Sequence, residues 1–293
     1  MAYNGVVVLI VEFHSHRICL CVAVSRNYGH CWVSSVAQVW NRTILSGPAC
    51  SGAGLSYLDG MPAQGIKLAS RYWFIVARGM LRFVAILVAM FSLAGRLSYW
   101  QAWAYGASGL LIGLVIAVQF AGKSDLIEER VRPGPGMKWW DKVFFALYIP
   151  SILAILAVAS LDAGRFRWSS PLPLPAYIAG YIVLAVAYSI VFWAMWTNRF
   201  FSSVVRIQTE RGHHVVQGGP YRFVRHPGYV GAILFGLATA VVLGSLWALI
   251  PAGLMAMLVV VRTALEDATL KRELPGYAAY TCQVKHRLVP GVW

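Results

Sequence analysis

The sequence has little charge, and very little of that charge is negative. Of its 293 residues 12% are charged, with 25 lysines and arginines against 11 aspartates and glutamates. A soluble domain usually carries roughly 25% charged residues, so this shortage argues against an ordinary soluble domain. A hydrophobic content of 59% and a mean hydropathy of +0.63 indicate a membrane protein instead.

Cysteine pairs with the spacing of a metal site are also missing. Four of the five cysteines lie in the first 50 residues, and the set is Cys19, Cys21, Cys31, Cys50 and Cys282. Zinc sites and disulfide frameworks need cysteines or histidines at regular, paired spacings. We therefore expect no metal site.

The start of the chain also lacks the basic end and uninterrupted apolar core of a signal peptide.

Long apolar runs, in contrast, are abundant. They cover residues 80–97, 99–121, 143–161, 176–197, 229–243 and 245–264. A membrane span needs about 20 apolar residues, which the first four runs satisfy. The last two are shorter and separated only by Gly244 and Ser245, which predicts a tight hairpin whose second arm is kinked at Pro251. The sequence predicts an all-α integral membrane protein with about six transmembrane helices.

Basic residues alternate between the connections, which predicts the orientation of these spans. Arg96, Arg165 and Arg167 lie in one set of connections. The other set is much richer and holds Lys67, Arg71, Arg78, Arg82, Lys123, Arg130, Arg132, Lys138, Lys142, Arg199, Arg206, Arg211, Arg222, Arg225, Lys271, Arg272, Lys285 and Arg287. Basic connections stay in the cytoplasm, so we expect a multi-pass protein with both termini cytoplasmic. Topology and anionic headgroups then explain the net charge of +14 better than a nucleic-acid partner.

The chain divides by composition into three regions. Residues 1–60 contain no clean span, because Glu12, His14, His16 and Arg17 interrupt their apolar run. We expect an atypical N-terminal extension there, either an over-extended start or a disordered segment. Residues 61–197 are expected to form the N-terminal membrane helices, and residues 198–293 hold two polar clusters.

The first polar cluster is the connection 198–229. Gly218, Gly219 and Pro220 signal a turn, and Pro227 is expected at the first position of a helix, where its missing N–H is not needed. Free N–H groups at such a terminus suit an anionic ligand. Arg225, directly before His226, adds a planar fork for a carboxylate or phosphate. The alternative is that these charges only mark the cytoplasmic side.

The second polar cluster closes the last span. Arg262 and Glu266 are four residues apart, so they share one face of a helix. If the hairpin closes, they lie level with Pro227. Ionisable residues at the edge of the membrane are functional candidates. The alternative is an interfacial ion pair that only stabilises the helix end.

Together the two clusters carry a resemblance to a known family. The pattern is His213-x-Val-Val, then Gly-Pro-Tyr at 219–221, then Arg225-His226-Pro227-x-Tyr229, followed by Glu266-Asp267 and Gly276-Tyr277. It resembles the isoprenylcysteine carboxyl methyltransferase family of membrane enzymes, which are related to phospholipid methyltransferases. The family usually has two glutamates where this chain has Glu266 and Asp267, which leaves the role of Asp267 open.

The resemblance implies a methyltransferase that uses S-adenosylmethionine and acts on a lipophilic or lipid-bearing acceptor in the membrane. A prenylcysteine carboxylate, a phospholipid amine or another small apolar acid or thiol would all fit. Residues 198–293 then form the catalytic region, with Arg262 and Glu266 as catalytic candidates and Arg262 receiving an acceptor carboxylate. The cofactor-binding candidates are His213, Val216, Gly219, Tyr221, Arg225, His226, Pro227, Tyr229 and Glu266. His213 could instead be a satisfied loop histidine.

Two other functions stay open at this point. A membrane sterol-reductase-like enzyme would bind NADPH in the same half of the chain, and Arg206, Arg211 and Arg222 could hold its 2′-phosphate. A small multi-pass transporter is disfavoured, because the ionisable residues cluster at one face and transporters more often place charge near the midplane.

Overall fold

The computed structural model describes residues 6–14, 17–25, 33–35, 63–120 and 135–293. It divides into two compact units, Met1–Ser70 and Arg71–Trp293. Three of the predicted cytoplasmic charges, Lys123, Arg130 and Arg132, lie outside the described residues.

The first unit contains a small antiparallel sheet in the order β1-β2-β3. Its strands are β1 (Val6–His14), β2 (Arg17–Ser25) and β3 (Val33–Ser35). β1 and β2 pair along their full length, from Val6 opposite Ser25 to His14 opposite Arg17. Runs rich in valine and isoleucine favour strands. Our sequence analysis did not predict these strands, and its expectations for the rest of residues 1–60 lie outside the described residues.

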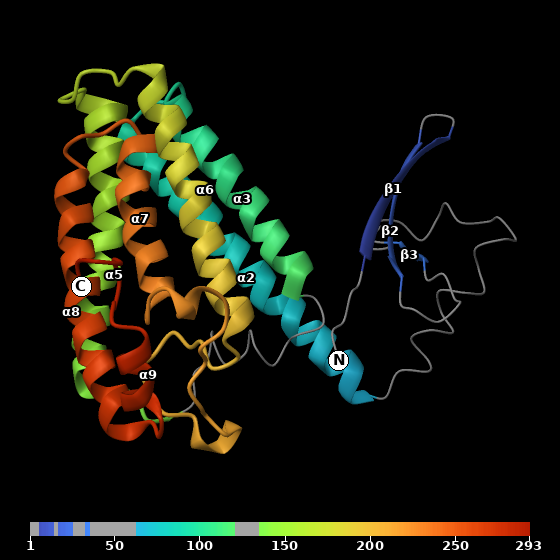
Figure 1. The fold of residues 1–293 in the computed structure, drawn as a ribbon. Helices are drawn as coiled ribbons and strands as arrows, with labels where there is room; N and C mark the ends of the chain where they lie inside the picture. The colour runs from blue at the N-terminus through green and yellow to red at the C-terminus, as the bar shows by residue number, and fades with distance from the viewer. Residues whose placement is uncertain (1–5, 15–16, 26–32, 36–62, 121–134) are drawn as a thin grey trace, which may run out of the picture. The chain divides into compact units, whose positions relative to one another are not determined.

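The second unit is a bundle of helices. Its long helices are α2 (Ala63–Ala94), of which residues 63–70 fall in the first unit, α3 (Trp100–Phe120), α5 (Trp139–Ala159), α6 (Leu174–Thr197), α7 (Pro227–Val242) and α8 (Leu249–Glu273). Shorter elements are the π-helix η1 (Ser160–Phe166), the 3-10 turns η2 (Thr209–Arg211) and η3 (Gly219–Arg222), and α9 (Tyr277–Gln283). Figure 1 shows the long helices side by side, with the connection before α7 and the helix α9 at one end of the bundle.

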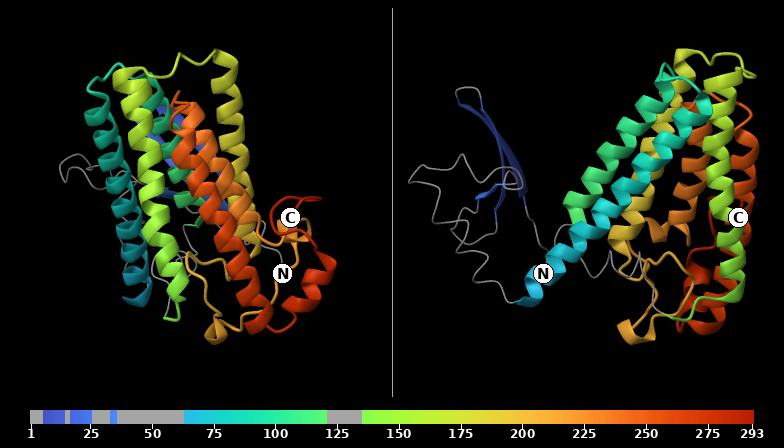
Figure 2. Two further views of the ribbon diagram at one scale, coloured as in Figure 1. Left: turned by 90° about the vertical axis from the view of Figure 1, so that its left-hand side faces the viewer. Right: turned by 180° about the vertical axis from the view of Figure 1, so that it is seen from behind.

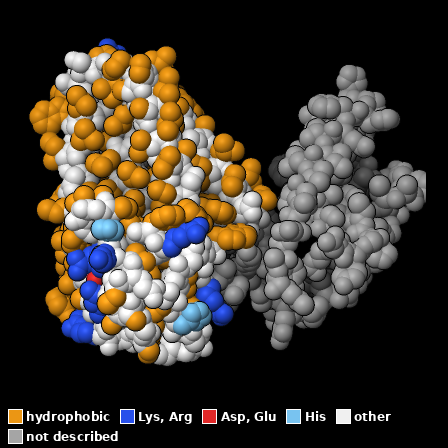
Figure 3. Space-filling view, in the orientation of Figure 1, with side chains coloured by type: hydrophobic (Ala, Val, Ile, Leu, Met, Phe, Trp, Pro, Cys, Tyr) orange, Lys and Arg blue, Asp and Glu red, His pale blue; other side chains and the backbone are white. Residues whose placement is uncertain are grey.

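Five of these helices, α2, α3, α5, α6 and α8, are long and apolar enough to cross a membrane, and α7 is a shorter apolar helix. Large hydrophobic side chains are exposed on their outer faces, and Figure 3 shows this apolar surface above a more polar end. The predicted all-α membrane fold is confirmed for this helical unit. The sixth predicted span is the short helix α7, so the count of about six holds only approximately.

The predicted hairpin is formed by α7 and α8, which pack against each other. Gly244 has a φ of +77°, a backbone conformation that glycine adopts without strain, so the chain can reverse there. The predicted kink at Pro251 was wrong. Because α8 begins only at Leu249, the proline falls in the first turn, whose N–H groups have no partner within a helix.

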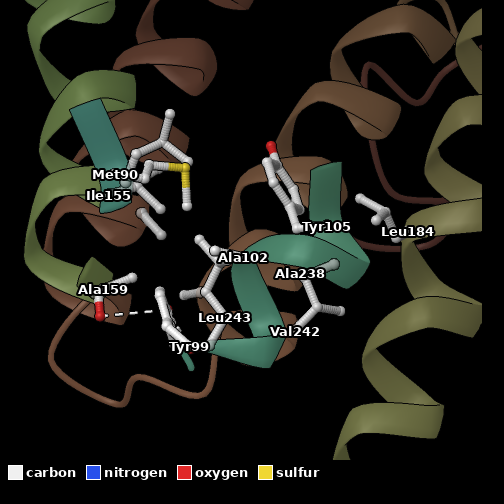
Figure 4. Close-up of a cluster of buried hydrophobic side chains, with 14 of the residues drawn as sticks. Met90, Tyr99, Ala102, Tyr105, Ile155, Ala159, Leu184, Ala238, Val242 and Leu243 are labelled. Atoms are coloured by element: carbon white, nitrogen blue, oxygen red, sulfur yellow. Dashed lines mark hydrogen bonds between the residues drawn. The ribbon is translucent and has the colours of Figure 1, made fainter. Parts of the chain in front are cut away.

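Small residues let the helices approach closely around a buried core. Ala94, Ala102, Ala159, Ala187, Ala238, Ala240 and Ala252 are all at most 3% exposed, and such residues are typical of contacts between membrane helices. Figure 4 shows this core with Tyr99 at its edge. The Tyr99 hydroxyl donates to the carbonyl of Leu243 at 2.7 Å and lies 3.4 Å from that of Ala159. It thereby joins the start of α3 to the turn between α7 and α8.

A buried carboxylate lies at the same end of the bundle, next to the turn between α7 and α8. Asp162 in η1 is fully buried and accepts hydrogen bonds from the Ser169 N–H at 2.6 Å, the Ser169 hydroxyl at 2.5 Å and the Ser245 hydroxyl at 2.6 Å. The Ser245 hydroxyl also accepts from the Ala248 N–H at 3.0 Å. Asp162 therefore links the segment before α6 to the turn between α7 and α8.

The contact between α6 and α7 provides a test of the packing. A Cβ added at Gly231 would lie 2.8 Å from the backbone oxygen of Ala187 and 2.5 Å from Val191 Cγ2. Since the backbone cannot move aside cheaply, we expect Gly231→Ala to destabilise the protein by about 1–3 kcal/mol. Thermal unfolding in detergent would measure this change.

Gly253→Ala in α8 is the matched control. No heavy atom lies within 4 Å of a Cβ added there, and alanine favours helices over glycine. Its melting temperature should therefore stay unchanged or rise slightly. Equal melting temperatures for the two variants would contradict the close approach of α6 and α7.

Candidate functional site

The residues that the sequence singled out gather at one end of the bundle. Three segments lie together there in all the views of Figures 1 and 2: the connection between α6 and α7, the last turns of α8, and α9. They surround a pocket of about 110 Å³ that is partly open to solvent. We call it the main pocket.

The main pocket combines apolar walls with polar groups, and its arginine and histidine side chains outnumber its acidic ones. Its apolar and aromatic side chains include Phe200, Phe201, Val204, Val205, Val215, Val216, Tyr221, Tyr229, Leu270, Leu274, Tyr277 and Tyr280. Its polar side chains are Asn198, Ser202, Arg206, His213, His214, Arg225, His226 and Glu266. Glu266 is the one carboxylate among the described residues that line it.

Eight of the nine predicted cofactor-binding residues line this pocket together: His213, Val216, Tyr221, Arg225, His226, Pro227, Tyr229 and Glu266. The ninth, Gly219, is not among the lining residues. It opens η3 with a φ of +56°, and a Cβ there would lie 2.5 Å from the Thr197 hydroxyl oxygen. Gly219 thus shapes the turn against the end of α6, at a point that leaves no room for a side chain.

The helix start predicted at Pro227 is confirmed, since α7 begins at that residue. His226 precedes it and is buried. Its Nδ1 lies 4.0 Å from the Glu266 carboxylate and its Nε2 lies 3.5 Å from that of Asp267. The Tyr229 hydroxyl donates to Glu266 Oε2. The first turn of α7 and the last turns of α8 therefore meet at the pocket, as the hairpin prediction required.

Arg225 is held by a carboxylate of its own chain. Its Nε donates to Asp267 Oδ1 at 2.8 Å and its Nη2 to Oδ2 at 3.2 Å. Its Nη1 donates to the carbonyls of Val284 and Lys285 at 2.7 and 2.8 Å. These contacts use four of the five N–H donors of a guanidinium. The predicted contact of Arg225 with a cofactor stays a prediction, and such a ligand would have to share the guanidinium with Asp267.

Asp267, whose role the sequence left open, lies at the centre of this cluster. It is fully buried and also accepts from the Tyr277 hydroxyl and from Arg287 Nε, both at 3.0 Å. Burial and the Asp267 charge raise the pKa of Tyr277, so this phenol stays protonated and continues to donate. Asp267 thus fixes Arg225, α9 and the following segment to α8.

Arg262 lies behind the wall of the main pocket and is not among its lining residues. Its Nε is 3.0 Å from Asp141 Oδ1, and its Nη2 donates to the Ser203 carbonyl at 2.7 Å. The other Asp141 oxygen accepts from the Val205 N–H at 2.8 Å. Both side chains are buried. The Asp141–Arg262 pair therefore anchors the segment 203–205, which forms part of the pocket wall.

Three aromatic rings surround the positively charged guanidinium of Arg262. The guanidinium carbon lies 4.4 Å from the ring centre of Phe144, 5.0 Å from that of Phe145 and 5.4 Å from that of Tyr229, and cations are attracted to aromatic faces at such distances. The sequence analysis missed Asp141, which is 121 residues away in the chain. A lone acid at the start of an apolar run was the one signal that could have pointed to it.

His213 is held as a neutral imidazole in the pocket wall. Its Nδ1 accepts from the Gln208 N–H at 3.3 Å, and its ring lies 4.5 Å from that of Phe200. Burial, with a smaller contribution from His214, lowers its pKa to about 4. The alternative of a satisfied loop histidine is thus consistent with its contacts, while the ring also lines the pocket.

The low pKa of His213 predicts a pH dependence. In the unfolded chain histidine has a pKa of about 6.5, so between that pH and about 4 the unfolded state binds more protons. The stability that neutral His213 contributes is complete above the unfolded pKa and is lost as the pH falls through this window. We expect the melting temperature to fall between pH 7 and pH 4.5, and to fall less in His213→Gln. An equal slope for both proteins would show that other groups cause the change.

Comparisons with known proteins point to methyltransferases. Residues 175–274 match the model of the phospholipid methyltransferase family. A segment of 46 residues is 42% identical to a probable protein-S-isoprenylcysteine O-methyltransferase of Oryza sativa subsp. indica, and equally to one of subsp. japonica. The aligned segment covers 16% of this chain and 24% of each relative, so the chain spans about a quarter of the length of the curated relatives it matches.

Residues 175–274 are therefore similar to the phospholipid methyltransferase family. The name of the two relatives agrees with the resemblance to isoprenylcysteine carboxyl methyltransferases that residues 213–229 and 266–277 predicted. The family match begins in α6, upstream of residue 198, where the sequence analysis placed the start of the catalytic region. It leaves out Asp141, the partner of Arg262.

Proposed function

We propose that the protein transfers a methyl group from S-adenosylmethionine to a lipophilic or lipid-bearing acceptor at the membrane surface. The observation that carries this proposal is the composition of the main pocket. One carboxylate, a basic corner at the start of a helix, and an apolar slot are combined in one space. The family match of residues 175–274 supports the same reaction class.

The groups of the pocket fit the parts of that cofactor. A single carboxylate, Glu266, suits a ligand that carries positive groups, namely an ammonium and a sulfonium. His226 and the positive end of the α7 dipole suit the cofactor's carboxylate, because helix N-termini attract anions. Val215, Val216 and Tyr221 offer apolar surface for a flat base. When bound, the cofactor supplies an already activated methyl group, so positioning and exclusion of water can provide most of the catalysis.

The chain's own residues then keep these groups in place. Tyr229 donates to Glu266 and fixes the orientation of its carboxylate. Asp267 holds Arg225 next to His226. The Asp141–Arg262 pair holds the pocket wall at Ser203 and Val205. That Arg262 receives an acceptor carboxylate stays a prediction, and the acceptor would have to share the guanidinium with Asp141.

The acceptor is proposed to be a lipid-type molecule that enters from the bilayer, with a prenylcysteine carboxylate as the first candidate. The relatives in Oryza sativa carry the corresponding name, and a phospholipid amine fits the family model as well. We further propose that the main pocket and both termini face the cytoplasm, following the distribution of basic residues.

The sterol-reductase-like alternative is less well supported by the geometry. Of the three arginines proposed for a 2′-phosphate, Arg206 lines the main pocket, whereas Arg211 and Arg222 are not among its lining residues. Arg206 Nη1 also contacts Glu210 at 2.7 Å, and Arg211 contacts Gln208 at the same distance.

A binding and an activity measurement on the purified protein test the proposal. We expect S-adenosylmethionine to raise the melting temperature and NADPH to leave it unchanged. Labelled methyl groups should then appear in one fraction of a lipid extract. Stabilisation by NADPH, without methyl transfer to any fraction, would favour the reductase instead.

A further inference from the structure

A second pocket lies beside the main pocket, on the far side of Arg225. It has a volume of about 390 Å³ and is lined by Arg225, Lys271, Thr281, Lys285, His286, Arg287, Val292 and Trp293. Four of these residues are lysine or arginine, and none is acidic. We call this second space the basic pocket. Figure 3 shows lysine, arginine and histidine side chains gathered in this part of the molecule, near the C-terminal segment labelled in Figure 1.

One buried carboxylate offsets part of this positive charge. Asp267 lies beneath the basic pocket and contacts Arg225, Arg287 and Lys271, at 2.8, 3.0 and 3.3 Å. Lys285 is exposed. Asp267 thus contacts three of the four cationic side chains, and these contacts use only part of the N–H donors of the two lysines and of Arg287. An anion with several oxygens would match this surplus of charge and donors.

The walls of the basic pocket are held by the backbone. The N–H groups of Arg225 and His226 donate to the carbonyls of His286 and Arg287, both at 3.0 Å. A terminal oxygen of Trp293, the last residue of the sequence, accepts from the N–H of Arg287 at 2.9 Å, and the Arg287 guanidinium lies 4.7 Å from the Trp293 ring centre. A site whose groups are already in position loses less entropy when a ligand binds.

The basic pocket also lies at the level where lipid headgroups are expected. Lys271 belongs to the last turn of α8, a helix long and apolar enough to cross a membrane. Clusters of basic residues at this depth attract the phosphates of anionic lipids. Planar guanidinium groups also match phosphate oxygens in geometry.

We propose that the basic pocket binds a phosphate group, carried by an anionic phospholipid headgroup or free in solution. This site shares Arg225 with the main pocket, and it takes no part in the proposed transfer of a methyl group. It does not depend on the proposed function, since binding can be measured without a methyl donor.

Binding of three probes to the full chain in non-ionic detergent tests the site. The probes are dioctanoyl phosphatidic acid, dioctanoyl phosphatidylcholine and inorganic phosphate. The binding of each probe is measured by thermophoresis. We expect saturable binding of phosphatidic acid and weaker binding of phosphatidylcholine. Lys285→Ala should weaken phosphatidic acid binding about fivefold, the effect of one basic residue near an anionic surface. The Lys271→Ala/Lys285→Ala double variant should weaken it about 25-fold.

Arg272→Ala is the matched control, because it removes one charge from the same turn of α8 outside the basic pocket. It should leave the affinity unchanged. Competition by inorganic phosphate at similar concentration would identify free phosphate as the ligand, and its absence would identify the headgroup. Equal losses in Arg272→Ala and Lys285→Ala, or equal binding of both lipids, would overturn the site. Melting temperatures without ligand would show that each variant is folded.

Discussion

Glu266→Gln is expected to weaken the binding of S-adenosylmethionine by about ten- to a hundredfold. Loss of a charge-assisted contact typically costs about 1.5–3 kcal/mol, which corresponds to that range. Glu266 is the one carboxylate among the described lining residues of the main pocket. Glutamine keeps an oxygen that can accept from the Tyr229 hydroxyl, so the variant removes the charge and preserves the packing.

Glu273→Gln serves as the control for that measurement. Glu273 is in the same helix and contacts Lys138 at 2.7 Å on the surface, and it does not line the main pocket. Calorimetric titration with the methyl donor should show normal affinity for Glu273→Gln and a large loss for Glu266→Gln. If both variants bind equally well, Glu266 only stabilises the end of α8, which is the alternative that the sequence left open.

Asp141→Leu is expected to have the largest effect on stability. It would leave Arg262 buried without its carboxylate partner, and breaking a buried ion pair in this way costs about 3–5 kcal/mol. By comparison, Lys138→Met removes a partner from the exposed pair with Glu273 and should cost about 0–1 kcal/mol. Thermal unfolding in the same detergent would compare the two variants.

The double variant Asp141→Leu/Arg262→Met separates stability from pocket geometry. Replacing both partners of a buried pair with apolar residues is often nearly neutral, so much of the lost stability should return. The hydrogen bonds to Ser203 and Val205 would still be missing. We therefore expect weak binding of the methyl donor in a stable protein. Full recovery of binding would show that this pair does not position the pocket wall.

The sequence predicted the parts of this structure that depend on local chemistry. The start of α7 followed from the proline at position 227, and the hairpin followed from two apolar runs separated by Gly244 and Ser245. Eight of the nine cofactor candidates line one pocket, because most of them lie in two short segments that the hairpin brings level. Local patterns were sufficient for these features.

Features that depend on long-range contacts were missed. Asp141 is 121 residues from Arg262, and its position at the start of an apolar run does not show which residue it pairs with. The sequence predicted that the Arg225 guanidinium binds a ligand. It does not show that this guanidinium already forms two hydrogen bonds with the Asp267 carboxylate. The kink expected at Pro251 depended on the position where α8 begins, and helix starts vary with tertiary contacts.

The short length of α7 has a consequence for the opposite end of the bundle. At about 1.5 Å per residue, the 16 residues of α7 extend about 24 Å, less than the roughly 30 Å of a bilayer's hydrocarbon core. With Pro227 at one boundary, the turn after Val242 would stop inside the other leaflet, where polar backbone groups find no water. Asp162 and Ser245 supply hydrogen bonds at that depth. Asp162 and Ser245 would therefore provide, within the membrane, the hydrogen bonds that water provides at the surface.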